Sequence, residues 1–471
     1  MVATRFERMV RYVRRLRSTT DRDNVGLDLA PDLPEADLRR LGRLVGETIE
    51  GRGGEVAARR RARAIGAAFS TLDVTGRRRF FDLLAEHHDD DDEAVDRAME
   101  GVYRATDDQA RRRAEAELRR ALQPRRERLF RRFAGLDGGL PFLVVLREDL
   151  LTHRAADPRL ADVDRDLKEV LTRWFDVALL SLVQLTWDSS ARLLERLIDY
   201  EAVHAIESWD DLKGRLGPGR RCYALLHPAM ADDPLIFVEV ALTRGIVTEL
   251  GPVLDHSAER VDATSADTAI FYSISNCHRG LAGVSLGDFL IKSVAEQLTH
   301  ELPNVRQFAT LSPLPGFRRW LEAAIRDGEL DLAPGERRRL SADDPELAEH
   351  HLAELVAGPV PDSADPRLAA AEPALMRLAA DYLVNRRAGA RALDPVAHFH
   401  LTNGASIERL NWWANPSPAG WERGLGMMVN YRYRLNHIER NYDRYVEGGE
   451  ITVTDGVRKL LTPVAAASDD R

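Results

Sequence analysis

The sequence predicts an α+β protein in two parts, an all-α N-terminal region followed by an α/β region. Apolar residues recur at intervals of three and four through about the first 188 residues, which is typical of packed helices. Near Gly217-Pro218-Gly219, short segments rich in β-forming residues begin. At 471 residues the chain is also long for one compact domain. We therefore expect a helical domain over residues 1–188 and a catalytic domain over residues 189–471.

The composition excludes several broad classes. The formal net charge of −9 argues against a general nucleic-acid-binding protein. No apolar run reaches the ~18 residues of a membrane span, so we expect no membrane partner. Two cysteines are too few for a disulfide framework or a zinc ribbon, and they predict a cytoplasmic protein.

Arginine dominates the basic residues. Lysine occurs only at positions 168, 213, 292 and 459, so arginine supplies 63 of the 67 basic residues, which indicates a GC-rich, bacterial genome. The basic stretch Met1–Thr20 is expected to form a first helix rather than a transit peptide. The clusters Arg59–Arg61, Arg77–Arg79 and Arg111–Arg113 alternate with acids, so we expect solvated helix faces or salt bridges between helices.

One acidic run resembles a metal site. His87 and His88 precede Asp89–Glu93. Adjacent aspartates rarely converge on one ion, so we interpret the run as the acidic start of a helix from Glu93 and expect no metal.

The second region is expected to alternate strands and helices. Thr186–Ser190 offers a cap and a break before a helix over Ala191–His204. Strands are predicted over Arg221–His227 and Leu235–Thr243, and the alternation is expected to continue to about Tyr433.

A glycine-rich turn follows the strongest predicted strand, Thr268–Ser275. Gly280, Gly283 and Gly287 lie between this strand and a helix predicted from Asp288 to Glu301. Backbone N–H groups at such a junction can hold a phosphate. The spacing matches neither a P-loop nor the Rossmann fingerprint, and an ordinary glycine-rich connection remains an alternative.

Several motifs together resemble a known family. Arg279–Gly283 resembles the pyrophosphate turn of the GCN5-related acyltransferase fold. The motifs Phe271–Ser275, Gly280–Gly283, Phe289–Lys292, Leu311–Phe317, Asp394–Ala405 and Asn430–Tyr433 are similar to those of malonyl-CoA decarboxylases. The resemblance covers about residues 175–433 and is weaker in the helical region. It implies a GCN5-related acetyltransferase-like domain with a mixed central sheet. It also implies that coenzyme A contacts Gly280, Ala282, Gly283, Val284, Ser285, Leu286, Gly287 and Asp288. Some animal members have a glutamate where this chain has Ser285, so the resemblance supports no acidic role there.

Ser312 lies in a Ser-Pro pair that follows a predicted strand. Such a pair is ordinarily a turn, because the residue before proline is held extended. The resemblance implies instead that Ser312 lies at the malonyl end of the thioester. No Gly-x-Ser-x-Gly motif surrounds it, so we expect a hydrogen bond to the malonyl carboxylate rather than a nucleophile.

His400 is the second expected catalytic residue. Asp394-Pro395 is typical of a helix start and Asn403-Gly404 of a helix end. In a helix, His398 and His400 lie about 200° apart and only one faces the site, whereas in a strand both do. We favour the helix. The resemblance selects His400 as proton donor, and an imidazole ordinarily ionises near neutral pH.

Three further residues are secondary candidates. Ser273 and Tyr433 match family positions that line the site, although each also suits a structural role. Asn403 is expected either to orient His400 or to cap its helix.

The resemblance implies decarboxylation of malonyl-CoA to acetyl-CoA and carbon dioxide, a reaction of fatty-acid metabolism or of malonate use. The thioester accepts the charge as carbon dioxide leaves, so we expect no cofactor. Backbone N–H groups on Tyr272–Ser275 are candidate donors to the enolate oxygen. The alternatives are an acyl-CoA-dependent N-acetyltransferase and a non-catalytic coenzyme A-binding scaffold. The helical domain is expected to mediate homo-oligomerisation, by analogy with the family.

Overall fold

The computed structural model describes residues 27–87, 92–255, 257–258, 260–341 and 344–462. The expected first helix over Met1–Thr20 and most of the acidic run before Glu93 lie outside these residues. The chain forms two compact units. One, here called the helical unit, contains residues up to Ser181 together with Leu225–Ile236 and Asn276–Leu286. The other, the sheet unit, contains Leu182–Ala224, Phe237–Ser275 and Gly287–Arg471.

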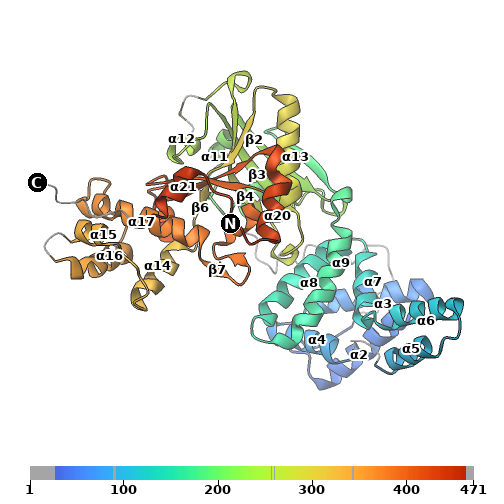
Figure 1. Cartoon of the computed structure of the whole chain (residues 1–471). Helices are drawn as coiled ribbons and strands as arrows, with labels where there is room; N and C mark the ends of the chain where they lie inside the picture. Colours follow the sequence, from blue (N-terminus) through green and yellow to red (C-terminus); the bar gives the residue numbers. More distant parts are fainter. Residues whose placement is uncertain (1–26, 88–91, 256, 259, 342–343, 463–471) are drawn as a thin grey trace, which may run out of the picture. The chain divides into compact units, whose positions relative to one another are not determined.

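The helices of the helical unit, coloured blue to teal in Figure 1, pack around one buried helix. Its helices are α2 (Glu35–Glu50), α3 (Gly54–Phe69), α4 (Val74–His87), α5 (Asp92–Arg104), α6 (Asp108–Ala121), α7 (Arg125–Ala134), α8 (Gly139–Arg154) and α9 (Ala161–Trp174). Residues 139–150 of α8 are all buried, because this helix is apolar on nearly every side. The rings of Phe69, Phe80, Phe81 and Phe142 meet edge to face around it.

The sheet unit contains a mixed sheet, of which Figure 1 labels β2, β3, β4 and β6. Its described strands run in the order β1-β2-β3-β4-β5-β10-β6, with β9 beside β10. The strands are β1 (Ser181–Leu185), β2 (Arg220–Leu226), β3 (Ile236–Thr243), β4 (Thr268–Asn276), β5 (Gln307–Thr310), β6 (Ser312–Pro313), β9 (Ser406–Asn411) and β10 (Met428–Tyr433). Strands β4 and β5 are parallel, whereas β10 is antiparallel to β5, β6 and β9. A helical region followed by a domain with a mixed central sheet was predicted, and this architecture is confirmed.

Helices and one small hairpin complete the sheet unit. The helices are α10 (Ala191–Tyr200), α11 (Trp209–Arg215), α12 (Gly251–Leu254), α13 (Gly287–Glu301), α14 (Phe317–Arg326), α15 (Pro334–Leu340), α16 (Ala348–Ala357), α17 (Pro366–Val384), α18 (Pro395–Thr402), α19 (Pro418–Gly424), α20 (Ile438–Val446) and α21 (Asp455–Leu460). Strands β7 (Arg387–Ala388) and β8 (Arg391–Ala392) pair immediately before α18.

Three local predictions were wrong. The stretch expected to be helical to residue 188 contains β1, which joins the edge of the sheet. Helix α10 ends at Tyr200 rather than His204, and the next four residues become part of a polar cluster described below. Strands do not alternate with helices throughout, because α14 to α17 follow one another between Phe317 and Val384.

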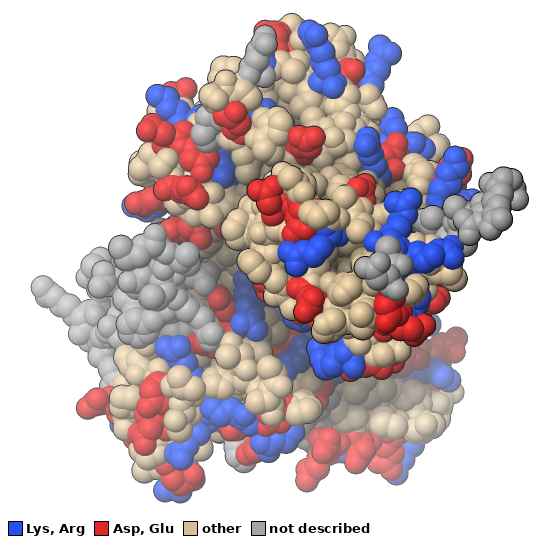
Figure 2. Space-filling view, turned by 90° about the vertical axis from the view of Figure 1, so that its left-hand side faces the viewer, with Lys and Arg blue, Asp and Glu red and all other residues tan. Residues whose placement is uncertain are grey.

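The arginine clusters pair with acids as expected. Arg59 bonds to Glu55 at 3.1 Å and Arg111 to Glu115 at 3.2 Å, each one helical turn away. Arg77 reaches the buried carboxylate of Asp149 at 2.9 Å. Figure 2 shows basic and acidic side chains intermixed on the face that it draws. None of the described helices has the length and apolar character needed to cross a membrane.

Candidate active site

Helix α18 positions His400. The carboxylate of Asp394 caps the first turn by accepting from the backbone N–H groups of Val396 and Ala397 at 2.9 and 2.8 Å, and Pro395 follows it. The helix ends at Asn403, and Gly404 adopts a φ of +78°. The prediction of a short helix is therefore confirmed, as are its two ends.

Ser312 and His400 meet inside the sheet unit. Ser312 lies on β6, where it pairs with Val429 of β10. Its Oγ lies 3.1 Å from Nε2 of His400, although 88 residues separate the two in sequence. Both residues are buried, with 6% and 2% of their surfaces exposed. The structure thus brings together the two residues that were predicted to be catalytic.

The second nitrogen of His400 contacts Tyr433. The Tyr433 hydroxyl lies 2.7 Å from Nδ1, and the ring of Tyr431 stacks on the imidazole at 4.5 Å between centroids. Ser312 Oγ donates to Thr310 Oγ1 at 2.9 Å, so it accepts from His400 Nε2. We therefore assign the hydrogen of the neutral imidazole to Nε2, with Nδ1 accepting from Tyr433.

His398 faces elsewhere. Its Nδ1 lies 2.8 Å from the hydroxyl of Tyr445 on α20, as expected from its position about 200° round the helix from His400. Asn403 is the C-cap of α18. Its backbone N–H donates to the carbonyl of His400 at 3.2 Å, which is a contact with the helix backbone rather than with the imidazole.

Burial keeps His400 uncharged in the free protein. Desolvation lowers its pKa from the usual 6.5 to about 3. An imidazole ordinarily ionises near neutral pH, whereas that of His400 is neutral at this pH in the free chain. The reason is a tertiary one, because the ring is enclosed by the side chains of Tyr431, Tyr433 and Ser312.

Asp394 links the helix of His400 to the turn that follows Ser312. Besides capping α18, its carboxylate accepts from the Tyr382 hydroxyl at 3.3 Å and from the backbone N–H of Gly316. A Cβ at Gly316 would lie 2.4 Å from the Tyr382 oxygen, so this close approach requires glycine. Burial raises the pKa of Asp394 to about 6. One carboxylate therefore fixes both segments that carry the Ser312–His400 pair.

Strand β4 continues beyond the end of its pairing with β5. The last register pair is Phe271 with Thr310, and the Phe271 carbonyl then accepts from the Leu311 N–H at 3.0 Å. The chain after β5 leaves β4, because β6 pairs with β10. Backbone groups of alternate residues in a regular strand point to the same neighbour, so regular pairing would direct the N–H groups of Ser273 and Ser275 to this open side.

The side chains on this free end bind a carboxylate. Ser273 Oγ donates to both oxygens of Glu201, at 2.7 and 2.8 Å, and Ser275 Oγ donates to one of them at 3.1 Å. The backbone N–H groups of Val203 and His204 also donate to Glu201, at 2.9 and 2.8 Å. Glu201 therefore ties β4 to the segment after α10.

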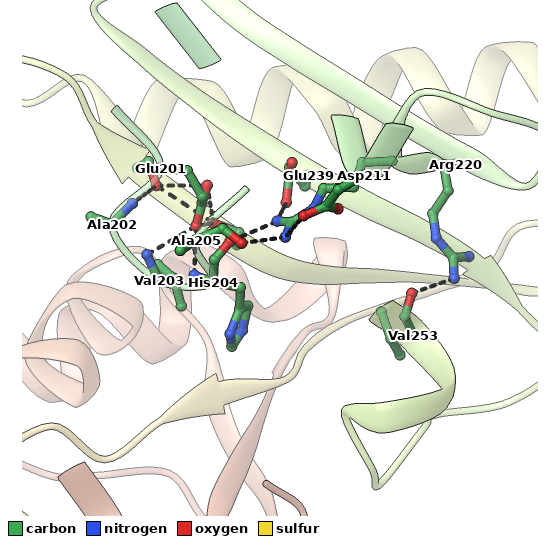
Figure 3. Close-up of polar contacts among 12 residues, drawn as sticks. Glu201, Ala202, Val203, His204, Ala205, Asp211, Arg220, Glu239 and Val253 are labelled. Carbon is green, nitrogen blue, oxygen red and sulfur yellow. Dashed lines mark hydrogen bonds and ion pairs between the residues drawn. The ribbon is translucent and has the colours of Figure 1, made fainter. Parts of the chain in front are cut away.

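Buried arginine holds this segment in turn. Figure 3 shows Glu201 to Ala205 beside Glu239 and Asp211. Arg215 donates to the carbonyls of His204 and Ala205 at 2.8 and 2.9 Å and to Glu239 at 3.1 Å. Burial raises the pKa of Glu239 to about 8 and lowers that of His204 to about 4. The result is a polar cluster that fixes the Glu201 carboxylate on β4.

The glycine-rich turn belongs to the helical unit up to Leu286. Its first part is a 3₁₀ turn, η5 (Arg279–Leu281), and the N–H groups of Ala282, Val284 and Leu286 donate within the loop. Arg147 of α8 donates to the carbonyls of Gly280 and Ala282, both at 2.8 Å. A Cβ at Gly280 would lie 1.9 Å from the carbonyl oxygen of Val144 on α8. Packing against α8 therefore requires a glycine at position 280. The sequence analysis had expected only a contact between this residue and coenzyme A.

The other loop residues that were predicted to bind the carrier differ in their exposure. Ala282, Gly283 and Ser285 are exposed, Val284 is half-buried, and Leu286 and Gly287 are buried. Helix α13 begins at Gly287 and includes Asp288, whose side chain lies outside the described part of the structure. Among the described residues, no group of three or more His, Cys, Asp or Glu side chains is placed to hold a metal ion.

Sequence reasoning missed Glu201, Thr310 and Arg147. Their partners lie 72, 2 and 133 residues away, respectively. Only Thr310 carried a local signal, because it stands on the same face of an extended segment as Ser312.

Family models match most of the chain. A model described as the malonyl-CoA decarboxylase C-terminal domain matches residues 178–470, and one described as the N-terminal domain of the same family matches residues 88–175. Both models bear the family name suggested by the sequence motifs.

Curated relatives and solved structures agree with the models. The mitochondrial malonyl-CoA decarboxylase of the goose Anser anser anser is 38% identical over 361 residues, covering 74% of this chain and 72% of that protein. The rat enzyme is 38% identical over 366 residues, covering 74% and 73%.

The crystal structure of malonyl-CoA decarboxylase from Rhodopseudomonas palustris is 40% identical and superposes with a TM-score of 0.79, covering 90% of this chain and 99% of that chain. The corresponding structure from Agrobacterium vitis is 37% identical with a TM-score of 0.81, covering 90% and 100%. The chain belongs to the malonyl-CoA decarboxylase family.

Proposed function

We propose that this decarboxylase converts malonyl-CoA to acetyl-CoA and carbon dioxide through Ser312 and His400. The observation that carries the proposal is the 3.1 Å contact between Ser312 Oγ and His400 Nε2 inside a buried site. A hydroxyl and an imidazole N–H side by side form a pair of donors suited to one carboxylate.

The substrate carries its own electron sink. When the C–C bond to the carboxylate breaks, the electron pair passes into the thioester carbonyl and gives an enolate. No cofactor is required for that step. The reaction consumes one proton, because malonyl-CoA loses a carboxylate and its methylene carbon becomes a methyl group. The protein must therefore orient the carboxylate, stabilise the enolate oxygen and deliver a proton to carbon.

His400 acquires this proton in response to the substrate. Its pKa of about 3 leaves the imidazole neutral in the free chain. A malonyl carboxylate placed against Nε2 raises that pKa, because a neighbouring negative charge favours the imidazolium. As carbon dioxide departs, the negative charge moves to the enolate, and the imidazolium gives its proton to the α-carbon. Ser312 keeps the carboxylate beside the imidazole by a hydrogen bond.

The free end of β4 supplies the donors for the enolate oxygen. Regular alternation from Phe271 would direct the N–H groups of Ser273 and Ser275 to the side that β5 leaves open. Backbone donors fixed in advance around a developing oxyanion are typically worth about 10²- to 10³-fold in rate. In this proposal the Ser273 hydroxyl is an anchor to Glu201 rather than a ligand of the substrate.

The carrier is assigned to the glycine-rich loop, residues 280–288. Exposed N–H groups at a turn with positive φ, such as Gly283 at +77°, suit a phosphate. Self-association through the helical domain belongs to the same proposal and rests on the family analogy. A cytosolic location is also part of it and rests on the buried thiols of Cys222 and Cys277, which form no disulfide.

The test is product analysis with malonyl-CoA as the only substrate. Purified protein, dialysed against a chelator, is expected to form acetyl-CoA and carbon dioxide in equal amounts by mass spectrometry. A transferase on the same fold would form neither without an amine acceptor, and a scaffold would bind coenzyme A without turnover. Either result would contradict the proposal.

A further inference from the structure

The ammonium group of Lys168 lies over the Gly283 turn. Lys168 is on α9, within the same unit as the turn. A Cβ built on Gly283 would lie 2.9 Å from Lys168 Nζ and 3.1 Å from its Cε. Gly283 is exposed and has a φ of +77°, so the absence of a side chain there leaves room for the lysine.

Arg147 fixes the orientation of this turn from inside. Its Nη1 donates to the carbonyls of Gly280 and Ala282, both at 2.8 Å. In a trans peptide the C=O and the following N–H point in opposite directions. Because the Ala282 carbonyl points to Arg147, the Gly283 N–H points away from the buried guanidinium. The turn therefore presents an N–H donor and a lysine ammonium at one exposed position.

The charges at the turn do not cancel. Asp164 lies one helical turn before Lys168 on α9 and would be its usual acidic partner. Its two oxygens are instead bonded to Arg147 at 2.8 Å and to Arg154 at 2.5 Å. Among the residues that the structure describes, no acceptor lies within hydrogen-bond distance of Lys168 Nζ. Buried Arg147 is thus neutralised, whereas the charge of Lys168 is left for a ligand.

We propose that Lys168 binds a phosphate group of the coenzyme A carrier at the Gly283 turn. This inference rests on the proposed function, and it adds a residue outside the loop that the motifs indicated. A lysine ammonium is a compact point charge with three donors, which suits phosphoryl oxygens of varied geometry. A charge-assisted hydrogen bond of this kind typically changes affinity by about 10- to 100-fold.

The experiment compares three substrates that differ in their phosphates, of which malonyl-pantetheine also lacks the adenosine. Malonyl-CoA has the pyrophosphate and the 3′-phosphate, malonyl-dephospho-CoA has the pyrophosphate alone, and malonyl-pantetheine has neither. Lys168→Met is expected to lower kcat/KM for malonyl-CoA by about 10- to 100-fold, through KM, with kcat nearly unchanged. With malonyl-pantetheine the variant and the parent protein are expected to agree within about two-fold. The dephospho substrate then identifies which phosphate is bound, since the penalty persists only if Lys168 holds the pyrophosphate.

Two further variants complete the design. Lys168→Arg retains the charge and is expected to recover much of the lost kcat/KM. Lys459→Met removes an equal charge from exposed α21 and is expected to leave all three substrates unaffected. A Lys168→Met penalty that is equal for malonyl-pantetheine, or no penalty with malonyl-CoA, would overturn the assignment. Both outcomes differ from failure of the proposed function, in which the parent protein itself would release no carbon dioxide.

Discussion

The hydroxyl of Tyr433 lies 2.7 Å from Nδ1 of His400, on the opposite side of the imidazole from Ser312. The ring is thereby held at both nitrogens, and the hydrogen bond that Ser312 donates to Thr310 leaves Nε2 as the nitrogen that carries the hydrogen. Tyr433 had been expected only to line the site. The contact indicates that it orients the imidazole and presents Nε2–H to the substrate.

Replacement of Tyr433 by Phe is expected to lower kcat by about 10-fold with little change in KM. The reason is that the variant loses a hydrogen bond to the imidazole of His400 and no contact with the coenzyme A carrier. Steady-state kinetics with malonyl-CoA measures the change. Tyr445→Phe is the matched control, since Tyr445 makes the equivalent 2.8 Å contact with His398. Equal losses in the two variants would mean that the phenols serve stability alone.

Ser273 and Glu201 are expected to act as one unit. In a double-mutant cycle, Ser273→Ala and Glu201→Ala should each lower kcat, and the double variant should be little worse than Glu201→Ala. The reason is that the Ser273 hydroxyl donates to both Glu201 oxygens, so its loss costs nothing once the carboxylate is absent. Additive effects would instead indicate that the hydroxyl contacts the substrate directly.

The buried imidazole makes stability depend on pH. The pKa of His400 is about 3 in the folded chain and about 6.5 when unfolded, so the unfolded state binds more protons between these values. The contribution of His400 to the free energy of unfolding is therefore full above pH 6.5 and is lost as the pH falls towards 3. Urea unfolding should show the stability of the parent protein, relative to His400→Asn, falling by up to about 1.4 kcal/mol per pH unit below pH 6. His204, with a pKa of about 4, contributes equally to both proteins.

Binding of a malonyl-like anion should take up a proton at pH 7. Sulfoacetyl-CoA carries a sulfonate in place of the carboxylate and cannot release carbon dioxide. Calorimetric titrations in buffers of different ionisation enthalpy should give an uptake approaching one proton for the parent protein and near zero for His400→Asn. Uptake that is the same in both proteins would remove His400 as the acceptor.

The site was predictable where its signals are local. Asp394-Pro395 and Asn403-Gly404 marked the two ends of α18, and this alone separated His400 from His398. The pairing of Ser312 with His400 came from the family motifs, because spacing in sequence says nothing of a contact across 88 residues. The lowered pKa of His400 was not predictable from the sequence, since the desolvation that lowers it comes from the packing of β10 against α18.

The remaining contacts depend on tertiary structure. Glu201 follows a helix that was expected to continue to His204. Its carboxylate has a partner to bind only because the folded chain places Ser273 of β4 beside it. Arg147 is one of many arginines in the sequence, and nothing local distinguishes it as the residue that holds the carbonyls of Gly280 and Ala282.

The comparison of two histidines on one helix tests the mechanism most directly. Malonyl-CoA turnover and acetyl-CoA affinity are measured for His400→Asn and His398→Asn. The account predicts a fall in kcat of at least about 100-fold for His400→Asn with unchanged affinity, and near-parent kinetics for His398→Asn. Turnover retained by His400→Asn, or lost equally in both variants, would contradict the assignment of His400 as the proton donor.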